Sequence, residues 1–174
     1  AHAIKYHPGM ALLEQFVEGT LSADVALAVS AHIDLCPHCQ RINRDMHQDF
    51  GSQFAKQNVK ADECDWSAMM DAITAQPQQT QKHPTSLPEQ APLAVRDREF
   101  IVPRALQRLA SEHGKWLNLG GISTAKLPTG GDYHVSLLYI SKDTQVPQHT
   151  HLGMEMTLVL SGKIVDENGE YRAG

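Results

Sequence analysis

The sequence is short of the features that mark a secreted or membrane-bound protein. It holds three cysteines in 174 residues, too few for the disulfide framework of a small secreted domain. Its longest apolar runs, such as 135–140, fall far short of the roughly 20 residues that span a membrane. No charged segment followed by an apolar one opens it, so we see no secretion signal. We therefore expect a cytoplasmic protein with no membrane partner.

Lysine and arginine are scarce in the first 75 residues, which hold five of them against ten Asp and Glu. Residues 76–174 hold ten of each kind. Because phosphate binding needs Lys and Arg, we expect no direct binding of nucleic acid. An acidic surface suits a basic protein partner, although ordinary solubility explains the charge equally well.

One short stretch, residues 32–39, combines three side chains that bind soft metal ions. His32 and Cys36 lie four residues apart, so on a helix they share one face. Pro37 suits the first position of a new helix, and a break there turns Cys39 back toward Cys36. This H-x3-C-x2-C spacing predicts three ligands of a tetrahedral zinc site.

A closed zinc site needs a fourth ligand, and the sequence offers His7, with His2 as a competitor. We expect His38 to be exposed, because Cys36 and Cys39 already occupy that corner of the site. Two other interpretations of the cysteines stay open. They are an inert buried pair and a thioredoxin-like redox pair.

Apolar residues recur at helical spacing through most of residues 1–75. The pattern predicts helices over 10–18, from 22 to 35, from Pro37 onward, and around 66–73. We expect their apolar stripes, including Phe50, Phe54, Trp66 and Met70, to form the core. Four short helices make a small core, which a bound zinc ion would stabilise.

A linker and a strand-rich region follow. Four prolines among glutamines, with few bulky apolar residues, indicate a linker over 76–97. Pro103 predicts a short helix over 104–113. Glycine turns separate β-like runs at 115–119, 122–127, 135–141, 154–161 and 163–165, and Asn168-Gly169 predicts a hairpin. The predicted fold class is therefore α+β, with a four-helix domain over 1–75 and an all-β domain over 98–174.

A second group of metal-binding residue types lies in the C-terminal region. His149 and His151 are two residues apart, so on a strand both imidazoles face one side. Glu155 follows four residues later and can reach the same point from the next strand. Two histidines and a carboxylate bind zinc, non-haem iron and other divalent ions. Two surface histidines beside a turn are the simpler alternative.

Residues 1–75 resemble the zinc-binding anti-sigma domain. That family carries a histidine near its start and an H-x3-C-x2-C motif further along, which His7, His32, Cys36 and Cys39 match. The resemblance implies a compact helical domain with a structural zinc held by these four residues. It also implies a partner, an ECF-type (group IV) sigma factor.

The C-terminal region resembles the first motif of the cupin barrel, from His149, His151 and Glu155 to Gly162. Asp143 stands where cupins usually carry a glycine, and the further histidine that cupins bring from a later strand is missing. Residues 98–174 are also too few for a whole barrel. We therefore expect an incomplete cupin barrel from a longer protein, in which a fourth metal ligand comes from beyond the residues given.

The order of the two motifs is similar to that of ChrR-type anti-sigma factors. The resemblance implies a regulator, not an enzyme, which inhibits a sigma factor through its zinc domain. The cupin, holding zinc or another divalent metal, would sense oxidative stress from singlet oxygen or an organic peroxide and trigger release. The competing hypotheses are a metal-dependent cupin dioxygenase with a helical zinc-binding appendage and a purely structural zinc adaptor.

Overall fold

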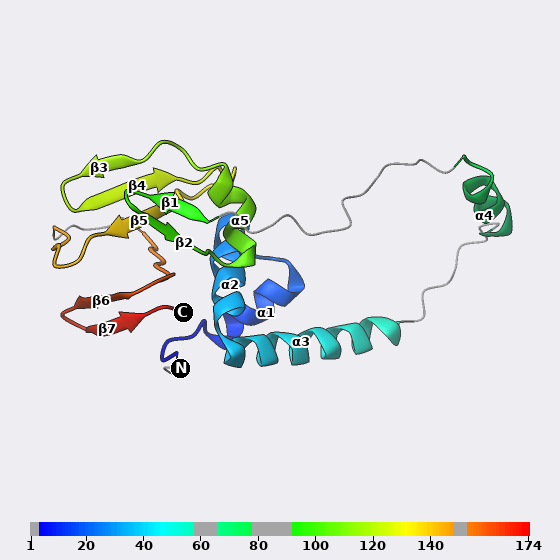
Figure 1. Cartoon of the computed structure of the whole chain (residues 1–174). Helices are drawn as coiled ribbons and strands as arrows, with labels where there is room; N and C mark the ends of the chain where they lie inside the picture. The colour runs from blue at the N-terminus through cyan, green and yellow to red at the C-terminus, as the bar shows by residue number, and fades with distance from the viewer. Residues whose placement is uncertain (1–3, 58–65, 78–91, 148–152) are drawn as a thin grey trace. The chain divides into compact units, whose positions relative to one another are not determined.

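The computed structural model describes residues 4–57, 66–77, 92–147 and 153–174. The chain divides into two compact units, one of residues 1–48 with 90–174 and the other of residues 49–89. The described residues form helices and short strands that pair only in antiparallel fashion (Figure 1). The fold class is therefore α+β.

Three helices follow one another in the N-terminal half: α1 (Met10–Glu18), α2 (Ala23–Leu35) and α3 (Pro37–Ala55). Helix α1 ends at Gly19, whose φ of 73° is the left-handed conformation that glycine adopts at low cost. The chain can then turn back, and Leu13 of α1 packs in one buried cluster with Val29 and Ile33 of α2. Cys36 and Cys39 belong to the same cluster, so the first core lies beside the predicted zinc ligands.

The break between α2 and α3 lies where the sequence predicts it. Cys36 leaves the helical conformation, with φ −109° and ψ 104°, while its N–H still donates to the carbonyl of His32. Pro37 then begins α3, at a position where the missing N–H of proline costs no helical hydrogen bond.

The C-terminal half contains one helix and seven short strands among its described residues. Strands β1 and β2 form a hairpin, β3, β4 and β5 form a three-stranded sheet, and β6 and β7 form a second hairpin. The elements are β1 (Leu93–Val95), β2 (Arg98–Phe100), α5 (Arg104–Ser111), β3 (Leu117–Leu119), β4 (Ile122–Lys126), β5 (Ser136–Ile140), β6 (Lys163–Asp166) and β7 (Gly169–Arg172).

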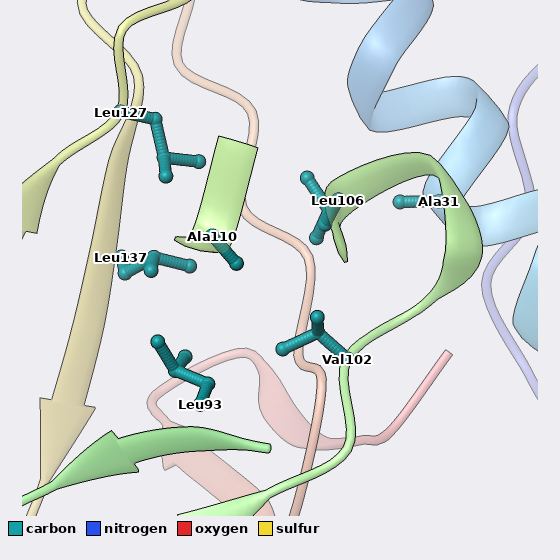
Figure 2. Close-up of a cluster of buried hydrophobic side chains, with 7 residues drawn as sticks. All are labelled: Ala31, Leu93, Val102, Leu106, Ala110, Leu127 and Leu137. Carbon is teal, nitrogen blue, oxygen red and sulfur yellow. The ribbon is translucent and has the colours of Figure 1, made fainter. Parts of the chain in front are cut away.

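A second buried cluster, shown in Figure 2, joins the C-terminal elements to α2. Leu106 and Ala110 of α5 pack with Leu127 and with Leu137 of β5, and Ala31 of α2 belongs to the same cluster. Helix α2 therefore contributes side chains to both buried clusters of this unit.

Two expectations for the C-terminal half need correction, and a third is not confirmed. Residues 154–161 form no strand, because a ladder needs a paired neighbour. Among the described residues, the one backbone hydrogen bond to this stretch from outside it runs from the N–H of Gly174 to the carbonyl of Val159. Leu158 and Leu160 nonetheless pack against the second cluster, as their alternation indicates. Strand β1 lies inside the stretch predicted as a linker, and the described strands form separate small sheets, so the expected incomplete cupin barrel is not confirmed.

The apolar stripes near the end of α3 and on α4 (Trp66–Thr74) were predicted as core, and this prediction is wrong. Phe50, Phe54, Trp66 and Met70 are between 49% and 68% exposed, and α4 has no buried residue. The described residues of the unit 49–89 supply two helical segments but no second layer to cover them. Helical spacing indicates an apolar face, not what covers it.

The described residues include no single helix with the length and hydropathy of a membrane span. Helices α1 and α2 meet the length and composition criteria only when taken together, and the pair is bent by 112°.

Two neighbouring leucines of β5 test the placement of the second cluster. Leu137 is 6% exposed and Leu138 is 55% exposed, because successive side chains of a strand point to opposite faces. We expect Leu137→Ala to lower the free energy of unfolding by about 2–5 kcal/mol. The matched Leu138→Ala should cost about 0.5 kcal/mol or less. Urea unfolding of both variants measures the difference, and equal losses would contradict the assigned face.

Candidate metal centre

Four side chains converge where α2 gives way to α3. His32 lies in the last turn of α2, Cys36 ends that helix, and Cys39 lies in the first turn of α3. The fourth, His7, comes from the extended segment that precedes α1. Two consecutive helices and one distant segment therefore meet at this point.

The distances between the ligand atoms fit a single tetrahedral ion. All four atoms lie within 4.8 Å of one another. His32 Nε2 is 3.3 Å from Cys39 Sγ, and His7 Nδ1 is 3.5 Å from the sulfur of both Cys36 and Cys39. Zn–S and Zn–N bonds of about 2.3 and 2.0 Å at a tetrahedral angle place sulfur and nitrogen about 3.5 Å apart. These three sulfur–nitrogen distances therefore match the spacing around a tetrahedral zinc ion.

Burial of the centre shows why a cation would matter there. His32, Cys36 and Cys39 are buried, whereas His7 is exposed. Burial raises the pKa of the Cys39 thiol to about 11, with a further contribution from Cys36, and burial lowers the pKa of His32. The metal-free centre therefore favours neutral groups. A bound dication reverses this preference, because metal ligation requires the thiolate.

A cavity of about 570 Å³ adjoins the His7 side of the centre. Its lining includes His7 and His32 from the N-terminal half and Tyr171 and Gly174 from the C-terminal half. The rings of Tyr6 and Tyr171 pack at one wall, with centroids 5.0 Å apart. The centre is thus closed on the side of the two cysteines and open beside His7.

The other candidate ligands are placed less completely. His38 is exposed, as expected, although its ring lies 4.9 Å from that of His7. His2, His149 and His151 lie outside the described residues. Glu155 is described and exposed. Among the described residues, the group of His7, His32, Cys36 and Cys39 is the one with metal-binding spacing.

One further polar residue, Asp24, is buried although no sequence pattern predicted it. Its side chain is 4% exposed, and its Oδ2 accepts the N–H of Tyr133 at 2.9 Å. Hydrogen bonds from Thr129 and Tyr133 lower the pKa of Asp24. An Asp in the first turn of a helix is explained by its favourable interaction with the helix dipole. The local sequence therefore does not indicate a partner more than a hundred residues away.

Comparison with known proteins agrees with both motifs. A zinc-finger family model matches residues 10–40, and the model of the ChrR cupin-like domain matches residues 106–174. The anti-sigma-E factor ChrR of Cereibacter sphaeroides is 31% identical over 172 residues, which are 98% of this chain and 77% of that protein. This chain belongs to the ChrR family of anti-sigma factors.

A solved member of the ChrR family has a similar fold. The crystal structure of Rhodobacter sphaeroides SigE in complex with the anti-sigma ChrR matches with a TM-score of 0.72 and 28% identity. The match covers 98% of this chain and 84% of that one. An anti-sigma factor is a regulator rather than an enzyme, so membership of the ChrR family decides against the dioxygenase hypothesis.

Removing one thiolate tests the metal centre. We expect Cys39→Ala to lose one metal ion per chain and most of the helical structure of residues 1–48, because the binding energy of a structural zinc is folding energy. Elemental analysis and circular dichroism measure the two effects. The matched control is His38→Ala, next to Cys39 but exposed, which should keep both. A Cys39→Ala protein with full metal content would contradict the assignment.

Proposed function

We propose that this chain is an anti-sigma factor that binds an ECF-type sigma factor through residues 1–75 and keeps it inactive. The observation that carries the proposal is the match over nearly the whole chain to an anti-sigma factor solved in complex with its sigma factor. The excess of acidic residues in 1–75 supports it, because a negative surface attracts a basic partner. The proposed location is the cytoplasm, where transcription takes place.

In this proposal zinc is structural. His7, His32, Cys36 and Cys39 hold it between the N-terminal segment, α2 and α3. The ion supplies charge compensation for the thiolates and joins segments that a small hydrophobic cluster holds only weakly. The residues themselves fix the direction in which α3 leaves the centre.

The sigma-binding surface in this proposal includes the exposed apolar face of α4. Trp66, Met69, Met70 and Ile73 follow the i, i+3, i+4, i+7 spacing of one helix face, and all are exposed. An apolar helix face of this kind lies readily in a hydrophobic groove of a partner. Tryptophan and methionine are also enriched at protein interfaces. The sigma factor would therefore provide the cover that this unit lacks by itself.

The C-terminal half is proposed as a cupin-like sensor domain over residues 98–174, joined by the linker that precedes it. His149, His151 and Glu155 would hold zinc or another divalent metal there, with a fourth ligand from outside the residues given. Oxidative stress, as singlet oxygen or an organic peroxide, would act on this domain and release the sigma factor. Support comes from the cupin-like family match and from the spacing of the three residues.

Binding of a purified ECF-type sigma factor tests the main proposal. We expect the intact chain to bind it and to block transcription from its promoter. The double variant Trp66→Ala with Met70→Ala should bind at least about tenfold more weakly, because buried anchors dominate such interfaces. The control Ser67→Ala lies on the same helix and should bind like the original chain. Failure of the intact chain to bind the purified ECF-type sigma factor would overturn the proposal.

The sensor assignment makes a separate prediction. The double variant His149→Ala with His151→Ala should keep its sigma affinity and lose one metal ion, leaving the thiolate centre filled. Release of the sigma factor by singlet oxygen should then slow by at least about tenfold, as for loss of a ligand that tunes a metal site. Unchanged release, measured by reporter transcription, would place the sensor elsewhere.

A further inference from the structure

Helix α2 has two buried faces that serve different parts of the molecule. Val25, Val29 and Ile33 pack in the first cluster, beside Cys36 and Cys39. Leu27 and Ala31 pack in the second cluster, with α5 and β5. Asp24, Leu27, Ala31 and Asp34 recur at spacings of three and four residues, which defines one stripe of a helix. This stripe faces the C-terminal half of the chain.

The two ends of the stripe are fixed by carboxylates. At the C-terminal end of the stripe, Asp34 Oδ2 accepts the N–H of Ala105 at 2.9 Å. Ala105 lies in the first turn of α5. The free amides and the dipole of a helix N-terminus favour a negative partner at this position. At the N-terminal end of the stripe, Asp24 contacts residues 128–134. We call this set of contacts the Asp24 contact.

The Asp24 contact has close steric and polar complementarity. Asp24 Oδ2 accepts the N–H of Tyr133 at 2.9 Å. Gly131 lies so close that a Cβ at its position would be 2.0 Å from Asp24 Oδ2. Glycine therefore leaves the space that the carboxylate fills, and its backbone φ is not in the left-handed region.

The Asp24 contact is also incompletely satisfied. Asp24 Oδ1 is buried and has no hydrogen-bond partner among the described residues. A buried carboxylate oxygen without a donor costs free energy, which would be recovered if residues 128–134 withdrew and water reached the side chain. The contact is specific in shape but is an easy point at which the two halves can separate.

Separation of the two halves at the Asp24 contact would affect the metal centre through α2. His32 directly follows Ala31 in the last turn of α2, and Cys36 ends the helix. Because α2 is a continuous helix of 13 residues, uncovering one face removes packing from the element that positions two ligands. We propose that the C-terminal half holds the metal centre closed through α2, and that the Asp24 contact controls the rate at which the centre opens.

Cobalt(II) in place of zinc provides a probe of this coupling. The charge-transfer absorption from thiolate to cobalt reports only a centre with cysteine ligands, so any metal in the C-terminal half does not contribute. The full 174-residue chain is loaded with cobalt and mixed with excess EDTA, and the decay of the band gives the release rate. No sigma factor is present, so the outcome is independent of the proposed function.

We expect Gly131→Ala and Asp24→Ala each to release cobalt at least about fivefold faster, the lower range of coupling between sites. Asp24→Asn should release it at the original rate, because its amide oxygen still accepts the N–H of Tyr133. The matched control Asp132→Ala changes an exposed residue of the same loop and should stay within about twofold of the original rate.

Release within twofold of the original rate by Gly131→Ala would overturn the proposal, whether or not Asp24→Ala folds. Amide hydrogen exchange provides a second readout on the same proteins. Exchange at Val29, His32 and Ile33 should quicken in Gly131→Ala and not in Asp132→Ala. Faster exchange confined to residues 128–134 would show that the loop moves without α2, and would also overturn the proposal.

Discussion

The structure depends on the requirement that one short helix satisfy two cores at once. Helix α2 packs Val29 in the cluster that contains Leu13 of α1 and Ala31 in the cluster that contains Leu106 of α5, so two of its sides are covered. A helix buried on both sides cannot shift to suit one core without disturbing the other, because packed interiors are dense. The position of His32 is therefore determined by packing on both sides, and the metal centre inherits its geometry from that packing.

The metal centre and the first core are not separable. Cys36 and Cys39 are fully buried members of the hydrophobic cluster and also members of the four-residue group with zinc spacing. Only three other residues of that cluster are buried, Leu13, Val29 and Ile33, which is a small core for independent stability. An ion that joins His7 to α2 and α3 adds a link that the apolar contacts lack. The structural role proposed for zinc follows from this shortage.

Local patterns in the sequence predicted most helices, the break at Pro37 and the convergence of His32, Cys36 and Cys39, because these features depend on neighbours within a few residues. They failed where the outcome depends on distant partners. The stripe on α4 has the spacing of a core helix, yet Trp66 is exposed because its own unit offers no covering layer. Residues 154–161 alternate like a strand but lack a paired neighbour. No local pattern predicted the role of Asp24, since its partners lie near residue 130.

The same distinction between local and distant contacts bears on regulation. The proposed sigma-binding face on α4 and the proposed sensor in the C-terminal half can influence each other only through an element whose free energy differs between the two states. Helix α2 meets this condition in the proposed scheme, because its contacts with residues 128–134 are made through a carboxylate that is only partly satisfied. Coupling is reciprocal for binding free energies. In the proposed scheme, a partner that stabilises the closed metal centre also stabilises the Asp24 contact. The C-terminal half would then be bound most strongly to α2 when the sigma factor is bound.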